Sequence, residues 1–216
     1  MMSNGNLDAG MSSEQAKPES PLAELKRAGS AARSGLVAVA ALVALLWIIE
    51  ALDAVLPGNW HRFGVRPHRV AGLRGIVFAP FLHAGWWHVI ANTVPLAVLG
   101  ALVAVGSLKR FASVFVLVAV ISGLGMWILG SSNEVHIGAS GVVFGLLTYL
   151  VVRGFFARKL GQIAVGIGVA MAYGGLLFGV LPTRSGVSWQ GHLFGAIGGV
   201  VAAWVLDRKR PPTPPS

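Results

Sequence analysis

The sequence predicts an all-α membrane protein with six membrane-spanning helices, and three observations lead to this fold class. First, 55% of the 216 residues are hydrophobic, only 12% are charged, and the mean hydropathy is +0.71. A soluble domain has roughly a quarter of its residues charged. Second, the apolar residues form long stretches with few charges, separated by short basic clusters. Third, the 29 glycines and 7 tryptophans are typical of packed membrane helices.

The order of the elements follows from the lengths of the apolar stretches. About 20 helical residues cross a hydrocarbon core roughly 30 Å thick. The polar residues 1–34 predict a disordered cytoplasmic tail. The stretch 75–108 is too long for one span, so we expect 57–83 to be a structured loop on or in the membrane surface. The expected membrane domain, residues 35–207, has helices at 35–56, 84–106, 111–133, 137–152, 160–183 and 185–206, and a cytoplasmic C-terminal tail follows at 208–216.

The distribution of basic residues predicts the orientation. With a cytoplasmic N-terminus, twelve of the 17 Lys and Arg residues lie on the cytoplasmic side, which agrees with the positive-inside rule. We therefore expect a multi-pass protein of the plasma membrane with both termini cytoplasmic. The five outer arginines are Arg62, Arg66, Arg69, Arg74 and Arg184. Four of them share the first loop, which we expect to pack on lipid headgroups, with Arg62, Arg66 and Arg69 binding those headgroups. Because the formal charge of +9 lies in such topological clusters, a nucleic-acid partner is not expected.

A few polar residues lie inside the apolar helices, where they are costly and usually functional. Ser140 precedes Arg153 by thirteen residues, which places it roughly 20 Å above the inner membrane face. The same reasoning places His192 at roughly 22 Å and Asn92 at roughly 25 Å, with His88 one turn further out. A hydroxyl, an imidazole and an amide from three helices are thus predicted at similar depth, which indicates a site.

A serine becomes a nucleophile when a base accepts its proton, and His192 is the histidine expected beside Ser140. No Asp or Glu is placed to complete a triad, so the sequence predicts a Ser–His dyad. Ser140 begins a helix after Gly138, so its backbone N–H is expected to point at a developing oxyanion. His88 and Asn92, four residues apart on one helix face, can add side-chain donors, whereas we expect His83 to order the preceding loop.

Both helices of the predicted dyad carry small-residue faces that would let their backbones approach closely. The glycines of these faces are Gly141, Gly145, Gly191, Gly195 and Gly199. Other interpretations remain open. The polar residues could serve only helix packing, His83, His88 and His192 could bind a metal, or a histidine could relay protons in a transporter. The chain has no Cys, and neither a metal nor a cofactor is expected.

At these residues the sequence resembles the rhomboid intramembrane serine proteases of the bacterial six-helix type. The matching motifs are His83-x4-His88-x3-Asn92, Gly138-Ala139-Ser140-Gly141 and His192-x2-Gly195-x3-Gly199. The resemblance implies a Ser140 nucleophile, a His192 base and oxyanion support from His88 and Asn92. Two departures are visible. Leu73-Arg74-Gly75 stands where the family often has a Trp-Arg pair, and Phe144 stands where many members have Tyr, so a ring is kept to pack on His192.

The resemblance implies cofactor-free hydrolysis of peptide bonds in or near the outer end of a substrate's membrane span. The expected partners are single-span membrane proteins and the lipid bilayer. Within the same fold, the alternative is an inactive rhomboid-like protein that binds membrane proteins without cutting them.

Overall fold

The computed structural model describes residues 20–182 and 186–208. Six helices in this part of the chain are long and apolar enough to cross a membrane, so the predicted six-helix, all-α fold class is confirmed. They are α1 (Pro21–Val55), α3 (Trp86–Ala104), α4 (Leu108–Leu129), α5 (Ser140–Ala157), α6 (Leu160–Tyr173) continued by the 3₁₀ helix η4 (Gly174–Val180), and α7 (Trp189–Asp207).

The segment between the first two long helices is structured, as the sequence predicts. It consists of four short helices: η1 (Trp60–Phe63), η2 (Val70–Arg74), α2 (Gly75–Phe78) and η3 (Ala79–Phe81). The guanidinium groups of Arg62 and Arg74 both lie 4.9 Å from the centre of the Phe63 ring. Val65 forms a two-way backbone bridge with His136, which ties this segment to the loop before α5.

The first helix begins well before the expected boundary at residue 35. Residues 21–34, expected in a disordered tail, are instead the first turns of α1. Ser20 caps the helix by accepting a hydrogen bond from the Ala23 N–H, and Pro21 occupies the first turn, where its missing N–H costs nothing. Ala, Leu, Lys and Glu are all strong helix formers, although Lys and Glu are polar. The change from polar to apolar sequence therefore did not mark the start of α1. Residues 1–19 and 209–216 lie outside the described residues.

Other helix ends also differ from the positions of the charges. Lys109 and Arg110 were expected between helices, yet they lie in the first turn of α4, which Ser107 caps through the Arg110 N–H. Arg153 lies inside α5, which continues to Ala157. Long basic side chains can remain in a helix near the membrane surface because their charged ends extend towards water. A charge therefore marks a helix end only to within about a turn.

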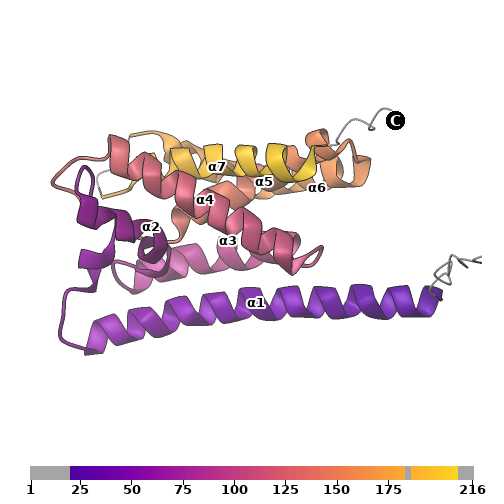
Figure 1. Ribbon diagram of the computed structural model, residues 1–216, viewed down its shortest axis with the longest axis horizontal. Coiled ribbons are helices and arrows are strands. Elements are labelled where there is room, and N and C mark those ends of the chain that lie inside the picture. The colour runs from indigo at the N-terminus through magenta and orange to yellow at the C-terminus, as the bar shows by residue number, and fades with distance from the viewer. Residues whose placement is uncertain (1–19, 183–185, 209–216) are drawn as a thin grey trace, which may run out of the picture.

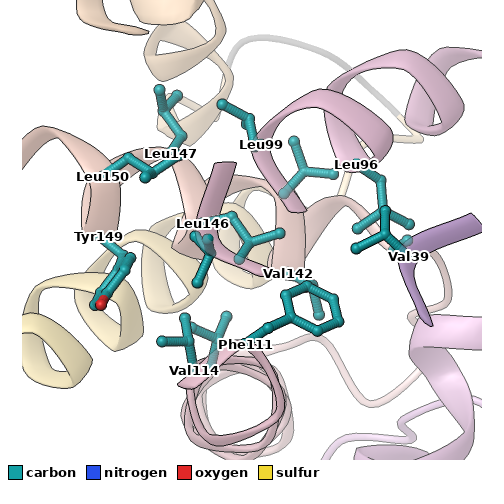
Figure 2. Packing of buried hydrophobic residues seen from close by; sticks show 14 of the residues in the cluster. Val39, Leu96, Leu99, Phe111, Val114, Val142, Leu146, Leu147, Tyr149 and Leu150 are labelled. Atoms are coloured by element: carbon teal, nitrogen blue, oxygen red, sulfur yellow. The ribbon is translucent and has the colours of Figure 1, made fainter. Parts of the chain in front are cut away.

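The helix α5 lies at the centre of the bundle. It has its most extensive contact with α7 and also contacts α3, α4 and α6. Figure 1 shows α4, α5 and α7 layered over one another, with α1 along one edge of the bundle. Figure 2 shows part of the core at this centre, where side chains from several helices meet. They include Val39 of α1, Leu96 and Leu99 of α3, Phe111 and Val114 of α4, and Val142 and Leu146 of α5.

A polar cluster joins three helices at the end of the bundle where α7 terminates. The Arg110 guanidinium pairs with the buried Asp207 carboxylate, and the Tyr149 hydroxyl donates to the same carboxylate over 2.7 Å. In Figure 1, α1 begins and α7 ends at this same end. The short connections from α3 to α4 and from α5 to α6 follow Ala104 and Ala157, whereas the loop before α5 lies at the opposite end.

Candidate active site

The structure brings Ser140 and His192 together. Ser140 is the first residue of α5, and His192 lies in the second turn of α7. The distance from the Ser140 Oγ atom to the His192 Nε2 atom is 2.8 Å. This is the usual length of a hydrogen bond in which a hydroxyl donates. The nucleophile and base predicted from the sequence are therefore in hydrogen-bond contact, although they are 52 residues apart in the chain.

The surroundings of His192 fix which of its nitrogens carries the proton. Its Nδ1 atom lies 2.9 Å from the Gly179 carbonyl oxygen, which can only accept. Nδ1 must therefore carry hydrogen, and in a neutral ring Nε2 is then free to accept the Ser140 proton. The Phe144 ring stacks on the imidazole, with centroids 4.1 Å apart and planes 9° from parallel. A carbonyl and an aromatic face thus orient an imidazole that is only 9% exposed.

The glycine faces of α5 and α7 bring the two backbones into direct contact. A Cβ atom added at Gly195 would lie 2.1 Å from the Gly141 carbonyl oxygen, and one at Gly199 would lie 2.0 Å from that of Gly145. Side-chain atoms do not approach a carbonyl so closely. The Ser122 hydroxyl of α4 donates to the Gly191 carbonyl over 2.8 Å, so α4 is also bonded to α7 beside this contact. The small-residue faces predicted from the sequence meet in the structure, with Gly141 next to Ser140 in the chain and Gly195 one turn after His192.

Gly138 makes a turn that another residue would strain. Its φ angle of +118° lies in the left-handed region. A Cβ atom there would also lie 2.7 Å from both the Cε1 and Nε2 atoms of His88. The Gly138 N–H donates to the Ala79 carbonyl over 2.8 Å, so the turn is anchored to the first loop. Gly138 therefore lets the chain enter α5 directly beside the His88 ring.

His88 and Asn92 have different hydrogen-bond partners. The His88 Nδ1 atom accepts from the Ala84 N–H over 3.2 Å, so in a neutral ring the hydrogen is on Nε2, which faces Gly138. This nitrogen can act as a donor in the site. One N–H of the Asn92 amide donates to the His88 carbonyl over 3.0 Å, within their own helix. The amide has a second N–H that this bond does not use.

His83 lies behind the site and connects two of its segments. Its side chain is among the most buried in the described part of the protein, and its Nε2 atom accepts from the Ala139 N–H over 3.4 Å. Its ring meets that of His88 edge to face at 4.9 Å. Burial, and then the neighbouring His88, lower the pKa of His83 to about 4. The ring is therefore neutral near pH 7 and can accept the Ala139 bond, in keeping with the expected ordering role.

A cavity of about 680 Å³ opens in front of these groups. Its lining includes His88, Asn92, Ser140 and His192, so these four side chains share one space although they come from three helices. In the described ranges, no three His, Asp or Glu side chains are close enough together to hold a metal ion. In these ranges, His83, His88 and His192 therefore do not form the group of ligands that the alternative metal site requires.

Several residues at the site were missed by the sequence analysis. Gly179 holds His192 through its backbone carbonyl, which no side-chain pattern can reveal. The His61 imidazole donates to the His83 carbonyl over 3.1 Å and lies 3.4 Å from the Asp53 carboxylate. Ser122 is a polar residue in an apolar helix, which was a usable signal. His136 and Ser188 are in contact at 2.8 Å on the cavity wall, but they lie in separate loops, so only the fold brings them together.

Comparisons with known proteins agree with this architecture. The family model of the Rhomboid domain matches residues 70–209. An uncharacterized protein of Mycobacterium bovis is 44% identical over 173 residues, which cover 76% of this chain and 72% of the relative.

Two other relatives carry the family name. YdcA of Bacillus subtilis, named as a candidate rhomboid protease, is 28% identical over 80% of this chain and 88% of its own length. Rhomboid-like protein 11 of Arabidopsis thaliana, a chloroplastic protein, is 33% identical over 61% of this chain and 52% of its own length. With a family model that covers most of its length and spans α3 to α7, the chain belongs to the rhomboid family.

Proposed function

We propose that this protein is an intramembrane serine endopeptidase that acts through a dyad of Ser140 and His192. The single observation that carries the proposal is the 2.8 Å contact between Ser140 Oγ and His192 Nε2 on the wall of a cavity. Membership of the rhomboid family supports protease activity at the level of the family.

The first half of the reaction forms an ester. As Ser140 Oγ attacks the carbonyl carbon of the scissile peptide bond, His192 Nε2 accepts the hydroxyl proton. The resulting imidazolium keeps its Nδ1–H on the Gly179 carbonyl, which stabilises the positive charge without a carboxylate. When the tetrahedral intermediate collapses, His192 gives the proton to the departing amine, and the acyl group stays on Ser140.

The second half reverses these roles with water. His192 takes a proton from a water molecule, whose oxygen attacks the ester carbon. The second tetrahedral intermediate then releases a carboxylic acid, and the proton returns to Ser140. Both products are accounted for by one peptide bond and one water molecule, and no cofactor enters the reaction.

The developing oxyanion needs donors in both halves. The first N–H groups of α5 have no partner within the helix, and Ser140 is its first residue. The Nε2–H of His88 and the second N–H of Asn92 line the same cavity. One such donor is worth roughly 3–4 kcal/mol of transition-state stabilisation. Loss of either side chain should therefore weaken cleavage less than loss of Ser140 or His192.

We further propose that the substrates are single-span membrane proteins, cut near the outer end of the span. Ser140 lies at the end of α5 remote from Arg153 and Arg158, which supports an outward position if those arginines face the cytoplasm. In this orientation both termini of a plasma-membrane protein would be cytoplasmic. A peptide bond inside a substrate helix is protected by its own hydrogen bonds, so small or helix-breaking residues near the cut should favour cleavage.

The test is cleavage of a single-span model substrate by the purified protein in liposomes. Wild-type protein should release two fragments, and mass spectrometry should place the cut in the outer third of the substrate span. The Ser140→Ala protein should be inactive while it remains folded. Equal failure of both proteins would favour the inactive membrane-protein binder, and a cut in the cytoplasmic third would contradict the proposed position of the site.

A further inference from the structure

A second histidine–serine contact lies next to the candidate dyad. The His136 Nδ1 atom and the Ser188 Oγ atom are 2.8 Å apart, the same distance that separates Ser140 and His192. His136 precedes Ser140 by four residues, and Ser188 precedes His192 by four. The same two chain segments thus meet twice, with the residue types exchanged between them.

Ser188 controls the first turn of the helix that carries His192. It is the N-cap of α7, and its Oγ atom accepts from the Gly191 N–H over 3.3 Å. Its backbone carbonyl accepts from the His192 N–H over 3.1 Å. The Ser188 hydroxyl hydrogen remains available to donate to the His136 Nδ1 atom. One residue therefore holds the start of α7 from within and connects it to the loop before α5.

His136 is a fixed point in that loop. Its N–H donates to the Val65 carbonyl and its own carbonyl accepts from the Val65 N–H, both over 2.9 Å. Its side chain is only 4% exposed, and its Nε2 atom lies 3.6 Å from the Glu134 carboxylate. Burial lowers the pKa of His136, although Glu134 acts in the opposite direction. A neutral ring with its hydrogen on Nε2 suits both neighbours, because Nδ1 can then accept from Ser188.

From this geometry we infer that His136 and Ser188 are positioning residues that hold Ser140 and His192 at their reacting distance. The inference rests on the proposed function. The dyad itself has only one hydrogen bond between its members, and the Gly179 carbonyl that orients His192 precedes the loop leading into α7. The His136–Ser188 contact supplies a second connection between the two segments, one helical turn or about 6 Å away along α7.

The test measures kcat, KM and melting temperature for the full-length protein in liposomes with a single-span substrate. His136→Phe keeps a ring of similar size but removes the acceptor, and Ser188→Ala removes the hydroxyl. A displacement of reacting groups by about 1 Å can cost on the order of a hundredfold in rate. We expect each variant to lower kcat by between about tenfold and about a hundredfold, with KM unchanged. The double variant should be no slower than the slower single variant, because both remove one contact.

Conservative variants and a matched cap separate positioning from folding. His136→Asn places an acceptor oxygen near the position of Nδ1, and Ser188→Thr keeps the hydroxyl, so both should retain most of the wild-type kcat. Ser107→Ala removes a serine N-cap of the same kind from α4, remote from the cavity. It should lower the melting temperature as Ser188→Ala does but leave kcat unchanged.

The rate at which a fluorophosphonate modifies Ser140 gives a second readout that needs no substrate binding. It should fall in His136→Phe and Ser188→Ala in proportion to kcat. A wild-type kcat in His136→Phe would overturn the positioning role while the dyad itself stands, and so would equal losses in His136→Asn and His136→Phe. If wild-type protein and Ser140→Ala are equally inactive, the proposed function fails, and this inference fails with it.

Discussion

The contact between α5 and α7 allows a quantitative prediction for Gly195. A Cβ atom at this position would lie 2.1 Å from the Gly141 carbonyl oxygen. To reach an ordinary contact of about 3.4 Å, the two backbones must separate locally by about 1.3 Å, the difference between these distances. Gly195 is one turn from His192 on α7, and Gly141 is adjacent to Ser140 on α5. The separation is therefore transmitted to the dyad.

We expect Gly195→Ala to lower kcat by on the order of a hundredfold, since a misplacement of about 1 Å has that effect on reacting groups. Overpacking of this kind should also destabilise the fold by about 1–3 kcal/mol. Gly195→Leu should be more severely impaired on both counts. The assay is cleavage of a single-span substrate in liposomes, with thermal unfolding of the same preparations to show that the variants are folded.

Gly168→Ala is the matched control. Gly168 lies in α6, and a Cβ atom there would meet nothing within 4 Å. The same change of residue type in a membrane helix should thus leave kcat unchanged. If folded Gly195→Ala protein cleaves at the wild-type rate, the backbone contact does not set the geometry of the dyad.

Three further predictions concern the rest of the molecule. Burial lowers the pKa of His83 from 6.5 to about 4, so between these pH values the unfolded chain binds more protons than the folded protein. The free energy of unfolding should therefore fall as the pH decreases from about 6.5 to about 4. This fall should be smaller in His83→Gln. Melting curves across this range check it, and identical slopes for both proteins would contradict it. Asp207→Ala leaves Arg110 without its carboxylate and should lower the melting temperature while kcat is unchanged; a large loss of kcat would show that the cluster acts on the site. Because the chain lacks Cys, a single cysteine at position 109 or 158 should react with an impermeant maleimide only after the cells are permeabilised, and labelling of intact cells would reverse the orientation.

Much of the fold was accessible from the sequence because the membrane imposes simple rules. Spans of about 20 apolar residues predicted all six long helices. The start of α1 was not accessible, since its first turns are polar and are formed by a serine cap, a proline and good helix formers. The depth of Ser140, His192 and Asn92 in the membrane could be calculated from the number of residues to the next charge, because the rise per helical residue is constant. The similar depths placed the three residues in one region.

The remaining parts of the site depend on the tertiary fold. The Gly179 carbonyl belongs to a 3₁₀ segment that no side-chain pattern marks. The Asn92 amide has one bond within its own helix, which spacing alone did not predict. His136 and Ser188 are in contact only because α5 and α7 begin side by side, and each residue alone has the sequence context of a loop. Sequence reasoning therefore located the two members of the proposed dyad better than the groups that contact them.

Covalent trapping shows whether His192 activates Ser140 as a nucleophile. Purified protein in liposomes is treated with a fluorophosphonate, digested and mapped by mass spectrometry. We predict a single adduct on Ser140 in the wild-type protein and none in folded His192→Ala protein, with loss of substrate cleavage in parallel. An adduct on another serine, or unimpaired cleavage by folded Ser140→Ala protein, would contradict the proposed role of the dyad.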